Sequence, residues 1–109
     1  MKEDFSEEVK KLISDYKKDD ISYAKPVDFL LPRIEATKEE IEKDIINCEN
    51  LKFTGKQQKD GETRYVMYFV YNSKKGRVYV VTFKDKIVII TAYPFGRRTL
   101  VRYRKRRFI

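Results

Sequence analysis

The fold is decided by residues 63–93, which read TRYVMYFVYNSKKGRVYVVTFKDKIVIITAY. This stretch contains three runs in which β-branched and aromatic residues dominate, and such residues favour β-strands. The runs cover residues 63–71, 77–83 and 86–93. The connections Asn72–Gly76 and Lys84–Lys86 are short enough for hairpins. The stretch therefore predicts three consecutive antiparallel strands.

Two helices are predicted before this stretch, near the start of the chain. Apolar residues recur at helical spacing from Phe5 to Tyr16 and predict a helix near residues 6–18, with Ser6 as its N-cap. Pro26 has a fixed backbone angle that suits the first turn of a helix, so a second, shorter helix is expected near residues 26–32.

A third helix carries a strong local signal. Thr37 and Glu40 have the spacing of a capping box, in which the side chain of each residue binds the backbone N–H of the other. Ile41, Ile45 and Cys48 follow on one face, so the helix is expected near residues 38–48. At the end of that face, Cys48 is expected to be a small buried hydrophobic residue rather than a nucleophile.

The predicted fold class is α+β, with N-terminal helices packed on a C-terminal antiparallel β-meander of about four strands, beginning at Leu51–Gly55. At 109 residues the chain is expected to form one domain, residues 1–109, with a basic C-terminal segment, residues 96–109. No apolar run approaches the roughly 18 residues of a membrane helix, and the N-terminus lacks the apolar run of a secretory signal. We therefore expect a cytoplasmic protein without a membrane partner. Abundant Lys, Glu, Ile and Tyr without Trp or His are typical of a thermophilic or viral source.

The composition narrows the chemistry that the chain can perform. It has no histidine and one cysteine, which excludes an internal disulfide, a four-ligand zinc site and an imidazole base. Its four glycines are scattered, so a glycine-rich phosphate loop is absent. We therefore expect neither a metal nor a cofactor.

The positive charge is concentrated at the C-terminal end. Residues 1–85 hold 17 Lys/Arg and 17 Asp/Glu, so the whole net charge of +8 arises after Asp85. Such a segment suits a polyanion, because contacts to a phosphate backbone release counterions, and arginine binds phosphate as a bidentate fork. The excess consists of Lys86, Arg97 and six further cations. These six are the residues predicted to bind nucleic acid: Arg98, Arg102, Arg104, Lys105, Arg106 and Arg107.

A strand that ends near Tyr93, turns at Gly96 and continues into Arg97, with Tyr103 six residues later, resembles the RelE/ParE toxin superfamily, including its RelE-like and BrnT-like members. The resemblance covers residues 23–104 in pattern and about ten residues in motif. It implies a small basic mRNA endoribonuclease, acting on the ribosome or on free RNA and held by a cognate, acidic antitoxin. It also implies that Arg97 and Tyr103 are the catalytic residues.

The chemistry of these residues fits that expectation. Cleavage of RNA by its own 2′-OH needs a base, stabilisation of the charged phosphorane and an acid. A tyrosine among arginines, such as Tyr103, can act as the base because neighbouring cations lower its pKa. Arg97 and Arg98 can clamp the phosphate oxygens.

Three alternatives remain open from the residues alone. The first is a non-catalytic nucleic-acid-binding protein of the same fold. In that case the ring of Tyr103 packs against the sheet, and Arg97 and Arg98 contact phosphate without taking part in a reaction. The basic segment can instead dock an acidic partner protein. Five strand tyrosines can either stack unpaired bases on an open sheet face or fill the core; they are Tyr65, Tyr68, Tyr71, Tyr79 and Tyr93.

Overall fold

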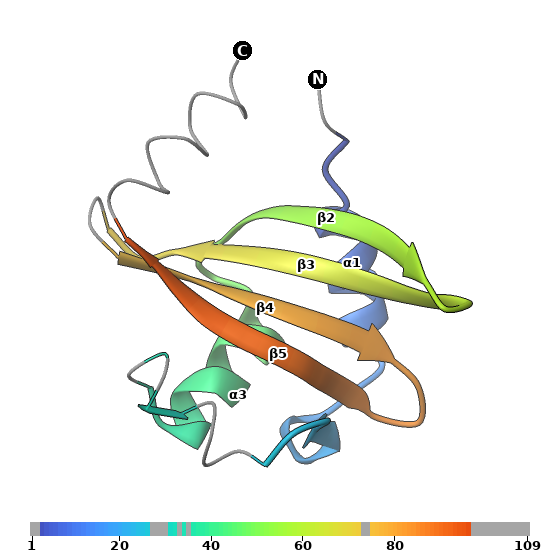
Figure 1. Cartoon of the computed structure of the whole chain (residues 1–109), viewed down its shortest axis with the longest axis horizontal. Coiled ribbons are helices and arrows are strands. Elements are labelled where there is room, and N and C mark those ends of the chain that lie inside the picture. Colours follow the sequence, from blue (N-terminus) through green and yellow to red (C-terminus); the bar gives the residue numbers. More distant parts are fainter. Residues whose placement is uncertain (1–2, 27–30, 33, 35, 73–74, 97–109) are drawn as a thin grey trace.

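A computed structural model describes residues 3–26, 31–32, 34, 36–72 and 75–96 of the chain. Figure 1 shows the arrangement of the elements in these ranges. In chain order they are the helix α1 (Ser6–Ile13), the 3-10 helix η1 (Lys18–Asp20), the strand β1 (Ile21–Tyr23), the helix α3 (Lys38–Asn47), and the strands β2 (Leu51–Lys59), β3 (Glu62–Val70), β4 (Lys75–Phe83) and β5 (Ile87–Gly96).

The five strands form one mixed sheet in the order β1-β5-β4-β3-β2. Strands β2 to β5 form an antiparallel meander, which confirms the three consecutive strands predicted for residues 63–93. The prediction of a purely antiparallel sheet of about four strands was wrong, because β1 pairs in parallel with β5, Ile21 opposite Ile87. The helices are also not all N-terminal to the sheet, since α3 follows β1 in the chain. The coarser α+β class holds.

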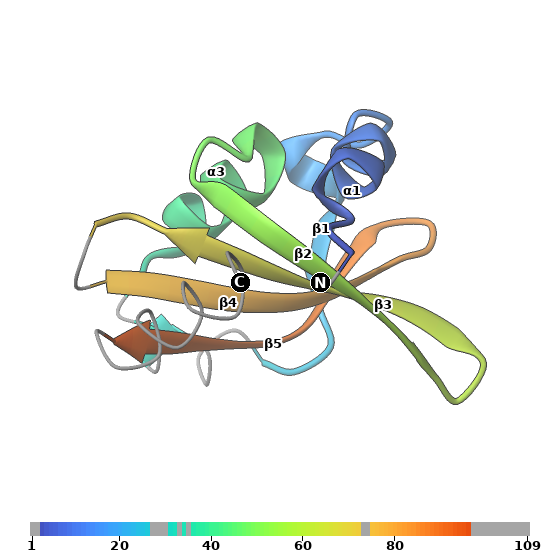
Figure 2. The same cartoon turned by 90° about the horizontal axis from the view of Figure 1, so that it is seen from above.

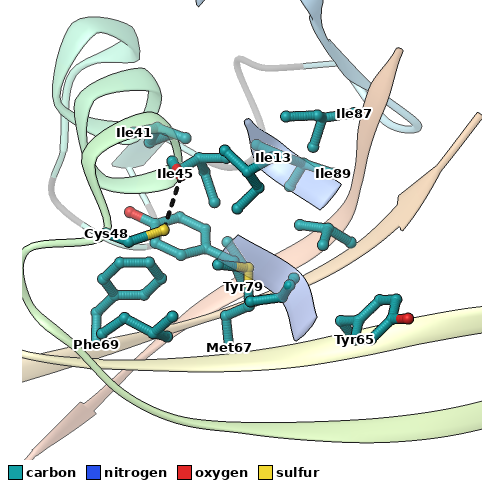
Figure 3. Close-up of a cluster of buried hydrophobic side chains, with 14 of the residues drawn as sticks. Ile13, Ile41, Ile45, Cys48, Tyr65, Met67, Phe69, Tyr79, Ile87 and Ile89 are labelled. Carbon is teal, nitrogen blue, oxygen red and sulfur yellow. Dashed lines mark hydrogen bonds between the residues drawn. The ribbon is translucent and has the colours of Figure 1, made fainter. Parts of the chain in front are cut away.

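Both labelled helices lie on the same side of the sheet, as Figure 2 shows. Strand residues alternate between the two faces, so every second side chain points at the helices. The main core lies between α1, α3 and the sheet (Figure 3). Its fully buried members, each below 2% exposed and drawn from both layers, include Val9, Ile41, Ile45, Met67, Phe69, Tyr79, Ile87 and Ile89.

The first helix is shorter than the predicted residues 6–18. It ends at Ile13, and the hydroxyl of Ser14 donates to the carbonyl oxygen of Lys11 at 2.6 Å, a local bond that competes with continued helix. The predicted N-cap was wrong as well. Ser6 is the first helical residue, and its hydroxyl lies 2.6 Å from Asp4 Oδ1 and 3.1 Å from Thr54 Oγ1, which ties the helix start to β2.

The capping box of α3 is confirmed. Thr37 Oγ1 accepts from the backbone N–H of Glu40 at 3.2 Å, and Glu40 Oε1 accepts from the backbone N–H of Thr37 at 3.3 Å. The helix runs from Lys38 to Asn47 and ends at Cys48, which has a left-handed backbone conformation. This end lies within one residue of the prediction. Most of the helix expected near residues 26–32 lies outside the described residues.

Candidate functional site

The residues predicted to carry the function follow β5 directly. Arg97, Tyr103 and the nucleic-acid-binding set of Arg98, Arg102, Arg104, Lys105, Arg106 and Arg107 all lie outside the described residues. The structure describes the chain up to Gly96, the last residue of β5, which is paired with Lys75, the first residue of β4. The basic segment therefore starts at the end of the sheet where β4 begins, at the left in Figure 1.

Lys86, which contributes to the positive charge after Asp85, lies apart from the start of the arginine-rich segment. Lys86 is exposed in the turn between β4 and β5, immediately before β5 begins at Ile87. Strand β5 is ten residues long, so at about 3.4 Å per residue its two ends lie roughly 30 Å apart. Lys86 is therefore far from the point where the arginine-rich segment starts.

The five strand tyrosines divide between the two faces of the sheet. Tyr65 and Tyr79 are buried in the helix-side core, and Tyr71 packs against it, so the core-filling interpretation holds for these three. Tyr68 and Tyr93 belong to the opposite face, on either side of Val78, which pairs with both of them. Tyr93 is 37% exposed and Tyr68 is partly buried, and Val78 between them is buried at 1% exposed.

A polar cluster connects α3 to the same end of the sheet. The carboxylate of Asp44 accepts hydrogen bonds from the hydroxyls of Tyr71 and, at 3.0 Å, Tyr79. The guanidinium of Arg77 lies 3.5 Å from the carboxylate oxygens of both Asp44 and Glu40, and 5.0 Å from the centroid of the Tyr71 ring. The Arg77 side chain is only 5% exposed, so a full positive charge is buried between the helix and the sheet.

The two phenols of this cluster act as hydrogen-bond donors. Burial, together with the hydrogen bond to Asp44, raises the pKa of Tyr71 above its ordinary value. Burial also raises the pKa of Tyr79, with Tyr71 and Asp44 adding to the effect. Both tyrosines therefore stay protonated at neutral pH, and neither is suited to act as a base.

This cluster forms one wall of a cavity of about 390 Å³. The cavity lies between α3, the residues that lead into β2, the residues that follow β3, and the start of β4. Its lining contains three carboxylates, three cations, three amides and one phenol; they are Glu40, Asp44, Glu49, Lys43, Lys75, Arg77, Asn47, Asn50, Asn72 and Tyr71. Among these described residues, charges of the two signs are equal in number, and every side chain can form hydrogen bonds.

Sequence reasoning missed this cavity, although two signals pointed to it. Asp44 occupies a position next to the apolar stripe of Ile41 and Ile45 on its helix. Arg77 stands at the helix-facing position of an otherwise apolar strand, where an isolated charge would be costly. A charged residue at such a position indicates a buried partner, but the partner itself depends on how α3 packs.

The remaining candidate chemistry is limited. Burial raises the pKa of the Cys48 thiol to about 11, and its Sγ donates to the carbonyl oxygen of Ile45 at 3.2 Å (Figure 3). The prediction that Cys48 is a buried hydrophobic residue is confirmed.

Within the described ranges, no group of three or more Cys, Asp or Glu side chains is arranged to hold a metal ion. In the same part of the chain, no helix is long and apolar enough to cross a membrane.

Comparison of the chain with models of protein families, with curated proteins and with solved structures finds no match.

Proposed function

We propose that this protein binds nucleic acid through the arginine-rich segment that follows β5. One observation carries the proposal: the first 85 residues are formally neutral, while seven cations, six of them arginines, occur between residues 97 and 107. The described fold supplies the attachment, because β5 is paired with β4 as far as Gly96 and the segment begins at the next residue. A cationic segment held at the end of a sheet suits a phosphate backbone.

Salt dependence tests this proposal. With about five phosphate contacts, the logarithm of the affinity should fall against the logarithm of salt concentration with a slope of roughly −3 to −5, the shallower value for single strands. Deleting Arg102–Ile109 removes most of the cations and should flatten the slope. Lys86→Ala is the matched control, because Lys86 lies at the opposite end of β5 and its removal should leave the slope unchanged. An unaltered slope after the deletion would exclude the segment as the binding surface.

A second candidate function is RNA cleavage, as expected of a RelE/ParE-like toxin. It is favoured by the spacing of Arg97 and Tyr103, together with the end of β5 at Gly96, which places Arg97 directly after a core strand. In this function Arg97 and Arg98 stabilise the phosphorane and Tyr103 moves the proton. RNA, free or on the ribosome, is then the substrate, and an acidic antitoxin is the partner that neutralises the basic segment.

A further inference from the structure

The cavity beside α3 lies at the corner of the fold where a bound strand would arrive. Lys75 lines the cavity and is also the register partner of Gly96, the residue before Arg97. Two residues further along β4, Arg77 lines the cavity and pairs with Pro94 of β5. The last described residue before the arginines is therefore paired with a residue that lines this cavity.

The chemistry of the lining indicates what kind of group fits. Among the described residues of the lining, Lys43, Lys75 and Arg77 are balanced by Glu40, Asp44 and Glu49, so these side chains together carry no formal net charge. The described lining of the cavity therefore has no preference for an anion such as phosphate. It offers carboxylate acceptors, cationic donors, and amides that can do both, which is the mixture that reads the edge of a nucleobase.

The volume of the cavity and the fixed positions of its wall residues also suit a nucleobase. A volume of about 390 Å³ falls in the range of sites for small organic ligands, roughly 300–1,000 Å³. The wall is held in place before any ligand arrives, because Asp44 accepts from Tyr71 and Tyr79 and ion-pairs with Arg77. Arg77 also reaches Glu40, which is itself fixed by the capping box with Thr37. A preordered polar wall lowers the entropic cost of binding.

We propose that this cavity receives one unpaired base of the nucleic acid bound by the arginine-rich segment. The inference rests on the proposed function, and it names the substrate class: a single strand, or a strand with an unpaired nucleotide, rather than a continuous duplex. Phosphates are held by the basic segment, and the base is read by the polar side chains that line the cavity. A base within a duplex has its hydrogen-bonding edge occupied and cannot enter.

The test compares strands with and without a base. Short single-stranded oligonucleotides with one abasic position, scanned along the strand, should include a position at which loss of the base weakens binding roughly 5- to 150-fold, as expected for the loss of a well-matched base contact. Asn47→Tyr, which places a ring in the cavity from the exposed end of α3, should weaken binding of the intact strand and remove the effect of the abasic position. The dependence of the affinity of Asn47→Tyr on salt concentration should equal that of the unaltered protein. Lys38→Tyr inserts the same ring at the exposed start of α3, away from the cavity, and should change neither property.

Free nucleosides provide an independent readout. Adenosine, cytidine, guanosine and uridine, titrated separately into the full chain, should shift the NMR signals of the side-chain amides of Asn47 and Asn50 for at least one base. If no abasic position weakens binding while the salt slope persists, the base cavity is wrong and the proposed function stands. If nucleosides bind the cavity but no strand binds with a salt dependence, the proposed function is wrong, the inference about a bound strand fails with it, and the cavity is a site for free nucleosides only. If Asn47→Tyr binds intact and abasic strands as the unaltered protein does, the base is held elsewhere and the inference fails.

Discussion

The hydroxyl of Tyr79, in the middle of the sheet, donates a hydrogen bond of 3.0 Å to the carboxylate of Asp44 on α3. Tyr79 is fully buried, and the same carboxylate also faces the buried guanidinium of Arg77. One acidic side chain thus satisfies two sheet residues that would otherwise face the apolar side of α3. Because Asp44 is on the helix and its partners are on the strands, this contact also fixes how α3 lies on the sheet.

Asp44→Ala should therefore destabilise the protein strongly. The change removes one of the two carboxylates that form ion pairs with the buried Arg77 guanidinium, and it removes the acceptor of two tyrosine hydroxyls. Loss of one partner of a buried ion pair typically costs about 3–5 kcal/mol of unfolding free energy. Urea unfolding followed by circular dichroism measures the change. Glu49→Ala, an exposed carboxylate beside the same cavity, is the control and should stay within about 0.5 kcal/mol of the unaltered protein. A loss below about 1 kcal/mol for Asp44→Ala would mean that the cluster contributes little to stability.

The stability of the contact between α1 and the sheet should depend on pH in the acid range. Glu8 accepts from Lys56 Nζ at 2.8 Å and from the Tyr65 hydroxyl at 2.6 Å, and these two bonds lower the pKa of Glu8. A carboxyl whose pKa is lower in the folded state contributes stability above its ordinary pKa, near 4.5, and loses it as the pH falls through the folded value. Glu8→Gln should thus reduce the unfolding free energy at neutral pH, and the difference should vanish in acid.

Urea unfolding at a series of pH values checks this prediction for Glu8. Glu7→Gln removes an exposed carboxylate one residue away and controls for the change in net charge. The role assigned to the Glu8 carboxylate would be contradicted if the difference in unfolding free energy between Glu8→Gln and the unaltered protein stayed constant from neutral pH into acid.

Two substitutions in the basic segment distinguish the catalytic function from nucleic-acid binding without catalysis. If Arg97 and Tyr103 act chemically, Arg97→Ala and Tyr103→Phe should each remove most RNA cleavage. Loss of Arg97 deletes one of several phosphate contacts, so the binding free energy should weaken by only about 1–2 kcal/mol. Tyr103→Phe keeps the ring, so binding and stability should hardly change, while cleavage should fall by about 10²-fold or more.

Cleavage should be measured on free RNA and, separately, on translating ribosomes. No cleavage in either assay by the unaltered protein, with salt-sensitive binding retained, would favour the non-catalytic function. If the Tyr103→Phe variant still cleaves RNA, the protein is an enzyme, but Tyr103 takes no part in its mechanism.

Much of the fold was predictable because its signals are local. The capping box of Thr37 and Glu40 lies within four residues, and the strands of the meander follow one another through short connections. By contrast, β1 has only three residues, and its pairing joins Ile21 to Ile87, 66 positions away. Nothing in so short a stretch indicates a parallel partner, so the mixed sheet was not predictable. The role of Ser6 at the start of α1 was missed for a related reason, because its hydroxyl contacts Thr54 of a distant strand.

The sequence by itself determined the α+β class, the positions of the meander strands and α3, the burial of Cys48, and the separation of a neutral body from a cationic end. These properties follow from periodicity, capping and the order of charges along the chain. Only the tertiary structure decided which tyrosines enter the core, that Arg77 is buried against Asp44, and that a polar cavity lies beside the start of the basic segment. Those outcomes depend on strand register and on the packing of α3, which are set by contacts between residues far apart in the chain.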